Sequence, residues 1–252
     1  MHAVWPASSA AGRAGRAAGN PGSVGVMLLA EDLLLLVTGD TSGQLSAPAA
    51  QVDAGLAGAN LVELAMMGKV DLSGEGEAGR AGRVVVRDPA PAGDDVLDAA
   101  LEILTANQGR KPSAVIRPLS RNLRQELYER LAVAGVVRAE RGKILGIFPT
   151  RTWPAQDASH EAQVRQLVTQ ALVQQAAPDP RTAALIALLH ALKCEHKIVD
   201  PRPYGLSRRQ LAARAGEIAG GNWASAAVRK AIDEMNAAVI AAATAATAAG
   251  AG

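Results

Sequence analysis

The chain has 252 residues, of which 49% are hydrophobic and only 2% aromatic, and its formal net charge is +2. A core with so few aromatic side chains must be built from Leu, Val, Ile and Ala, which favours helices over sheets. The single cysteine, Cys194, excludes an internal disulfide. We expect neither a secretory signal nor a transmembrane span, because each apolar run is interrupted by charge or is too weakly apolar to insert.

In chain order, residues 1–24 are rich in Ala, Gly, Ser and Pro and are predicted to be a disordered leader. A single domain is predicted over residues 25–248, followed by a short tail at residues 249–252. Helices are predicted over residues 27–37, 49–67, 95–107, 118–134, 159–174, 180–193, 207–218 and 222–247, and β-hairpins over residues 69–72 with 83–86 and 136–139 with 143–148. The predicted fold class is therefore mainly α, a single large helical domain with two small β-hairpins.

The predicted helix over residues 118–134 carries two arginines three residues apart, Arg121 and Arg124. At this spacing both side chains project from one side of a helix, opposite its leucines, and two guanidinium groups there can hold one phosphate. Tyr128 is predicted to lie on the same water-facing side. Arg130 falls on the leucine side, and the helical pattern does not explain it.

Charge is concentrated around this helix. The window from Gly109 to Arg151 holds ten basic and three acidic residues, a net charge of +7, whereas the whole chain carries only +2. Two arginines alone are more often a solvated helix face with weak ion pairs. A basic patch on an otherwise acidic chain, however, predicts an anionic partner.

Two anionic partners fit this pattern. A helix followed by Gly135 and a hairpin with basic residues at its tip is the order of a winged-helix DNA-binding module, and the segment Leu206 to Gly216 is similar to the first half of a helix-turn-helix. A phospholipid head group at a membrane surface is the other partner. The nearly balanced total charge disfavours DNA, which stays the alternative.

No residues predict catalysis, and no cofactor is expected. His190, Cys194 and His196 lie close together in the sequence, but three candidate ligands without a fourth do not favour a metal site. The sequence has no nucleophile elbow, no phosphate-binding P-loop and no dinucleotide-binding fingerprint.

Several segments taken together resemble the Golgi phosphoprotein 3 family. They are the leucine-rich run Met27 to Leu36, Gly55-Leu56-Ala57-Gly58 continuing to Val70, Asp95 to Leu101, Arg121-Asn122-Leu123-Arg124 through Gly135-Val136-Val137 into the hairpin ending Gly146-Ile147-Phe148, and Asp179 to Ala191. No one of them is specific, but their order and spacing over about Val26 to Ala238 support the resemblance. The composition and the lack of an organelle signal fit a bacterial relative.

The resemblance implies a mostly helical domain that binds phosphatidylinositol 4-phosphate, or a related phosphoinositide or anionic lipid, peripherally on membranes. The basic pair of the family's head-group pocket matches Arg121 and Arg124. The family's pocket tryptophan falls near Pro48 and its pocket arginine at Ala57, so both are missing here. Arg117 and Arg151 are the predicted substitutes, and the protein is expected to be cytoplasmic and peripherally associated with membrane.

The family's hairpin also serves self-association. The resemblance therefore implies a homo-oligomer or membrane contact through Val137, Arg141, Lys143 and Ile144. Trp153, beside the hairpin, is expected to be a packed loop residue, with anchoring at a membrane interface as the alternative.

Overall fold

A computed structural model describes residues 27–74, 76, 80–144, 148–221 and 237. The predicted leader, the predicted tail and almost all of the helix predicted over residues 222–247 lie outside these residues. Helices dominate the described part, which also contains two small antiparallel sheets, so the predicted mainly α fold class is confirmed.

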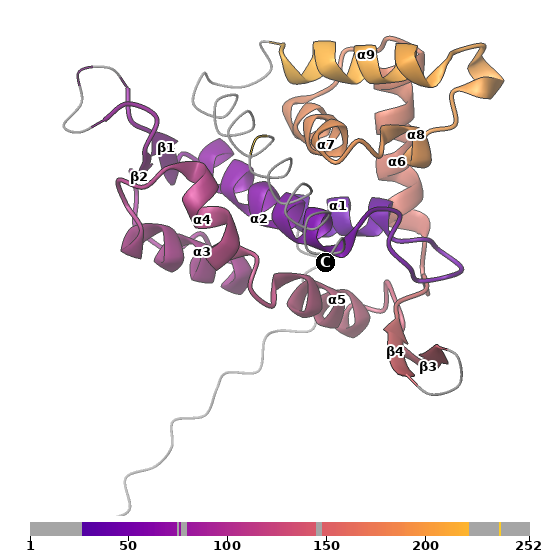
Figure 1. Cartoon of the computed structure of the whole chain (residues 1–252), viewed down its shortest axis with the longest axis horizontal. Helices are drawn as coiled ribbons and strands as arrows, with labels where there is room; N and C mark the ends of the chain where they lie inside the picture. The colour runs from indigo at the N-terminus through magenta and orange to yellow at the C-terminus, as the bar shows by residue number, and fades with distance from the viewer. Residues whose placement is uncertain (1–26, 75, 77–79, 145–147, 222–236, 238–252) are drawn as a thin grey trace, which may run out of the picture.

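Two central helices, α1 (Leu29–Val37) and α2 (Ala49–Met66), pack against each other and are flanked by helices on two sides (Figure 1). One group consists of α3 (Asp95–Ala106), α4 (Pro112–Leu119) and α5 (Leu123–Val133), all of which contact α2. The other group consists of α6 (Ser159–Val173), α7 (Pro180–Ala191), α8 (Glu195–Ile198) and α9 (Arg208–Ala219), with α7 packed on both central helices. Within the described residues, no helix is both long and apolar enough to cross a membrane.

The first hairpin forms where the sequence predicts it. Strand β1 (Val70–Leu72) pairs antiparallel with β2 (Val84–Val86), with Val70 opposite Val86. It extends directly from the end of α2 and packs on α3.

The helix predicted over residues 118–134 is in fact two helices. Pro118, predicted to be a first-turn proline, lies in the last turn of α4, and Pro112 is the proline that starts this helix. The chain then turns through Asn122, whose φ of 61° is left-handed, before α5 begins at Leu123. Asparagine tolerates this conformation better than most residues, so the break occurs there.

The second hairpin is also displaced from its prediction. Strand β3 (Glu140–Ile144) pairs with β4 (Phe148–Thr152), and Arg141 lies opposite Arg151. Val136 and Val137 do not belong to this ladder, because both backbone amides turn back to the carbonyl of Leu131. These two bonds end α5, so the strand can begin only later in the chain.

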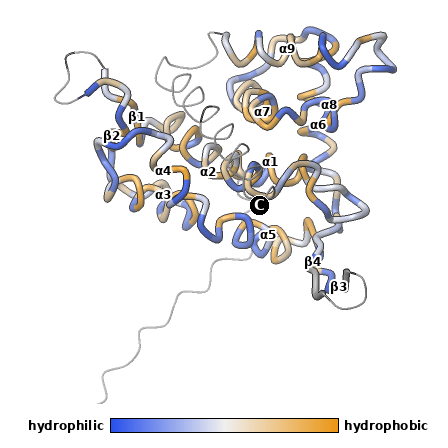
Figure 2. Tube along the Cα trace, viewed as in Figure 1, coloured by the Kyte–Doolittle hydropathy of each residue, from blue (hydrophilic) through white to orange (hydrophobic). Residues whose placement is uncertain are grey.

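The core is centred on α1 and α7. All nine residues of α1 are buried, as is the run from Thr182 to Leu189 in α7. Figure 2 shows hydrophobic residues concentrated along α7. Burial of these leucines and alanines supplies the main stabilisation of the fold, since few aromatic side chains are present.

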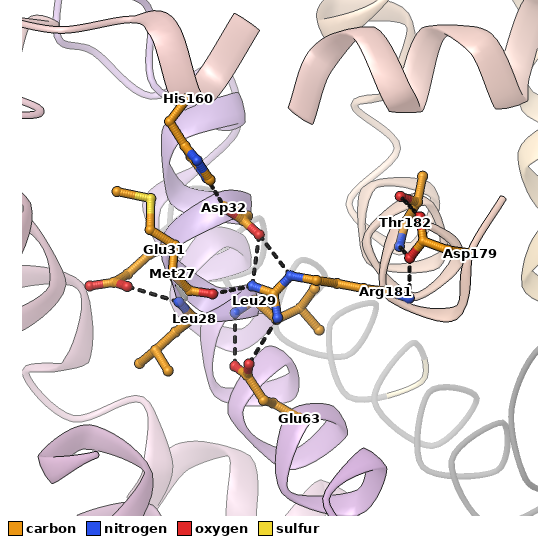
Figure 3. A network of polar contacts seen from close by, with 10 residues as sticks. All are labelled: Met27, Leu28, Leu29, Glu31, Asp32, Glu63, His160, Asp179, Arg181 and Thr182. Atoms are coloured by element: carbon orange, nitrogen blue, oxygen red, sulfur yellow. Dashed lines mark hydrogen bonds and ion pairs between the residues drawn. The ribbon is translucent and has the colours of Figure 1, made fainter. Parts of the chain in front are cut away.

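Two carboxylates are buried with α1. Glu31 and Asp32 lie in its first turn and are 5% and 4% exposed. Arg181 of α7 donates to Asp32 Oδ2 from Nη2 at 2.8 Å and to Glu63 Oε1 from Nη1 at 3.0 Å, and also bonds the Met27 carbonyl (Figure 3). His160 Nε2 lies 2.7 Å from the other Asp32 oxygen. Three helices are thereby linked to α1 through its charged first turn.

The other buried carboxylate, Glu31, meets Arg130 of α5. Arg130 donates to Glu31 Oε1 at 3.1 Å and makes a two-bond contact with Asp94, at 2.8 Å for each bond. Although burial raises the pKa of Asp94, the hydrogen bonds and charge of Arg130 outweigh it and hold that pKa below its usual value. Arg130 therefore faces the leucine side of α5 because it neutralises carboxylates there.

We expect Arg181→Ala to lower the free energy of unfolding by about 3 kcal/mol, because it leaves the buried Asp32 charge with His160 as its one remaining side-chain partner among the described residues. Urea unfolding followed by circular dichroism measures this. Arg209→Ala, at an exposed position of α9, is the control and should change stability by less than about 0.5 kcal/mol. Equal stability of the two variants would contradict the proposed role of Arg181.

Cys194 is fully buried after α7, where its thiol contacts the Leu189 carbonyl at 3.6 Å. Burial raises the pKa of this thiol to about 12. Among the described residues, no group of three or more His, Cys, Asp or Glu side chains is placed to hold a metal ion.

The native Cys194 thiol should therefore react with a disulfide reagent at pH 8 on the order of a thousandfold more slowly than the same thiol in urea. Absorbance of the released thiolate measures both rates. Fast labelling of the folded protein would show that the residue is accessible.

Candidate anion-binding pocket

A hollow of about 680 Å³ opens between the start of α2, the start of α5, the end of β4 and the loop between α1 and α2. It is lined by Gly43, Gln44, Leu45, Ala47, Ala49, Asp53, Ser120, Asn122, Arg124, Gln125, Tyr128, Arg151, Thr152 and Trp153. Two of the four predicted head-group residues, Arg124 and Arg151, lie in this wall.

Two stacked aromatic rings form one side of the pocket. Tyr128 and Trp153 are parallel within 6°, with ring centroids 4.9 Å apart. The Tyr128 hydroxyl lies 2.8 Å from Thr38 Oγ1, which itself donates to the Leu34 carbonyl, so Tyr128 is left to act as the donor. The prediction that Tyr128 faces water is therefore wrong, since its contacts with Trp153 and α1 bury it. Trp153 is also buried, as expected for a packed loop residue.

The loop after α1 fixes the position of Trp153 through backbone hydrogen bonds. Gly43 has a left-handed φ of 59°, and its carbonyl accepts a hydrogen bond from Trp153 N at 3.3 Å. A Cβ atom at Gly43 would lie 2.3 Å from the same nitrogen. The Asp40 carbonyl also accepts from Ala155 N at 2.8 Å. The close approach of these two backbones requires glycine at position 43.

Arg124 is paired with a carboxylate. Its Nε donates to Asp53 Oδ1 at 2.8 Å, and both side chains are about one-third exposed. Burial raises the pKa of Asp53, an effect only partly offset by the charge and hydrogen bond of Arg124. The contact uses only one nitrogen of Arg124, so both Nη groups have no hydrogen-bond partner among the described residues.

Arg151 enters the pocket from β4. Its guanidinium carbon lies 5.5 Å from the ring centroid of Trp153, within the range of a cation–π interaction. The nearest acid, Glu129, is 3.7 Å away, and it also accepts a hydrogen bond from Gln125. Arg151 is 42% exposed, so its charge remains available at the pocket mouth.

Arg121 and Arg124 do not share a helix face. Arg121 precedes the Asn122 N-cap, so it belongs to the turn between α4 and α5, and the predicted clamp on one helix is wrong. Arg121 is exposed and makes no ion pair with any described residue. Arg117, on the exposed side of α4, also lies outside the pocket wall. Both still lie on the segment that leads into the pocket at Ser120.

A sequence model of the Golgi phosphoprotein 3 (GPP34) family matches residues 29–235. The chain belongs to the Golgi phosphoprotein 3 family. The match covers α1 through α9, and therefore every element that forms the pocket.

The two positions where the resemblance places a pocket tryptophan and a pocket arginine, Pro48 and Ala57, lie at the start of α2 and within it. Pro48 is the N-cap of this helix, and Ala57 is fully buried in it. Neither lines the hollow, whereas Asp53, one turn before Ala57, does. The aromatic residues in the wall of the hollow are Tyr128 and Trp153, and α2 contributes the acid Asp53.

The structure describes the side chains of two of the four residues predicted to form an oligomer or membrane contact, Val137 and Arg141. Val137 is 2% exposed and pairs with Ala155, so the prediction that it forms an oligomer or membrane contact is wrong: it is a core residue. Arg141 is exposed on β3, opposite Arg151. The side chains of Lys143 and Ile144 lie outside the described part of the structure. A contact through the hairpin stays a prediction.

We expect Gly43→Ala to lower the free energy of unfolding by about 2 kcal/mol, since the added methyl group would collide with the Trp153 backbone. Gly68→Ala is the matched control, because Gly68 has a similar φ of 72° but nothing within 4 Å of the new atom. Thermal unfolding measures both. If the two variants lost equal stability, the close approach would have no energetic effect.

Proposed function

We propose that the protein is a non-catalytic, peripheral membrane protein that binds the phosphate of an anionic phospholipid head group in this pocket. The observation that carries the proposal is the convergence of Arg124 and Arg151 on one hollow, beside the exposed Arg121. The free Nη groups of Arg124 are the donors that would meet the phosphate.

The surface around the pocket supports the same partner. Residues 109–125 contain five basic side chains and no acidic one, and they run along α4 into the pocket. Each exposed basic side chain near an anionic membrane contributes about 1 kcal/mol to binding. Phosphatidylinositol 4-phosphate and related phosphoinositides are the lipids that family membership suggests.

The test is flotation of the protein with vesicles that contain an anionic lipid. Arg121→Gln/Arg151→Gln leaves the Arg124–Asp53 pair intact and should weaken binding by about 30-fold, the equivalent of two lost contacts. Arg208→Gln/Arg209→Gln on α9 removes the same charge at exposed positions and should have a much smaller effect. An equal loss in both variants would indicate general attraction without a site.

Duplex DNA, the alternative partner, is tested in the same assay as a competitor. DNA binding would give a retarded band whose intensity falls steeply with salt, and no uptake by vesicles. In the structure, α5 packs against α1 and α2, which leaves only part of its surface for a groove. We therefore expect DNA not to displace the protein from vesicles at physiological salt.

A further inference from the structure

The pocket contains a negative charge as well as two positive ones. Its charged lining residues are Arg124, Arg151 and Asp53, which together carry a charge of +1. Just outside the lining, Glu129 lies 3.7 Å from Arg151 and Arg121 is exposed beside Ser120, and their opposite charges leave this sum unchanged. Asp53 is oriented by Arg124 through one oxygen only, and its Oδ2 has no hydrogen-bond partner among the described residues.

We propose that Asp53 makes this pocket selective for a phosphodiester head group bearing free hydroxyls, such as inositol or glycerol, over a head group with a phosphomonoester. The inference rests on the proposed function and specifies the ligand class of the same site.

Charge matching is the first argument. A phosphodiester carries one negative charge, equal and opposite to that of the pocket wall, whereas a phosphomonoester carries about −1.5 to −2 at neutral pH. Because Asp53 is only about one-third exposed, its repulsion of a second anion is screened less than it would be in water. Part of the negative charge of a phosphomonoester at this site would therefore have no positive charge to neutralise it.

Hydrogen-bond chemistry is the second argument. An ionised carboxylate only accepts hydrogen bonds. The free Oδ2 of Asp53 can therefore accept a hydrogen bond from a hydroxyl group, whereas an ionised phosphate oxygen has no hydrogen to donate to it. The neighbouring Nη groups of Arg124 can donate to a phosphate oxygen at the same time. The neutral polar lining residues Gln44, Ser120 and Thr152 suit further hydroxyl groups. Arg124 would thus bind the phosphate, and the adjacent Asp53 would bind the hydroxyl groups of the polyol.

The experiment compares vesicles containing phosphatidylinositol, phosphatidylglycerol or phosphatidylinositol 4-phosphate in a neutral lipid background. The native protein should bind the two hydroxyl-bearing phosphodiesters at least as tightly as the 4-phosphate, although the latter carries more charge. Asp53→Asn removes the charge but keeps an oxygen for Arg124, and it should shift the affinity ratio toward the 4-phosphate on the order of tenfold.

Asp53→Ser is a second variant without the charge and should shift the ratio in the same direction. Asp200→Asn is the matched control, since Asp200 is an exposed carboxylate that does not line the pocket. Its removal should leave the affinity ratio unchanged. Soluble glycerophosphoinositol should compete the native protein off phosphatidylinositol vesicles if the pocket reads the head group, and fail to compete if only the membrane charge is read.

The outcomes separate this inference from the proposed function. Binding of all three lipids with a ratio unaffected by both Asp53 variants would overturn the selectivity and leave lipid binding standing. Failure of soluble head group to compete would also overturn it. If no anionic vesicle binds, the proposed function itself fails.

Discussion

The fold depends on the neutralisation of two carboxylates buried at the start of α1. Burying the charged carboxylates of Glu31 and Asp32 without partners would cost several kcal/mol each, a large fraction of the free energy of folding. Their partners, Arg130, Arg181 and His160, come from α5, α7 and α6. Helices that are distant in sequence are thereby fixed around one helix end.

This arrangement also determines where the pocket forms. Arg130 fixes α5 against α1, and two residues earlier on the same helix Tyr128 bonds Thr38 at the other end of α1. Trp153 stacks on Tyr128, and Arg151 lies over Trp153. The guanidinium of Arg151 in the pocket wall is therefore positioned through a chain of contacts that begins in the core.

Local pattern was sufficient to predict most helices and the first hairpin. The helices predicted to start at residues 95, 180 and 207 start at or next to those positions in the structure, where the side chains of Asp94, Asp179 and Ser207 cap α3, α7 and α9. Local sequence pattern failed where the same residue type is compatible with two different local structures. Pro118 suits the first or the last turn of a helix, and the valines before β3 suit a strand or a buried turn.

The candidate site was less accessible from the sequence, because its contacts are long-range. Asp53 lies 71 residues before Arg124, and Glu31 lies 99 residues before Arg130. One signal was present: Asp53 is the only charged residue in the first half of α2, where most neighbours are small or apolar. An acid in such a segment indicates a partner cation, but not which one.

The position of Trp153 has a practical consequence. Its indole stacks on the phenol of Tyr128 and lies within cation–π range of the Arg151 guanidinium, so the pocket wall contains its own chromophore. Because indole emission responds to nearby charge, an anion drawn to Arg151 changes the spectrum of this residue. With Trp5 and Trp223 replaced by phenylalanine, the protein reports occupancy of its pocket without any added label.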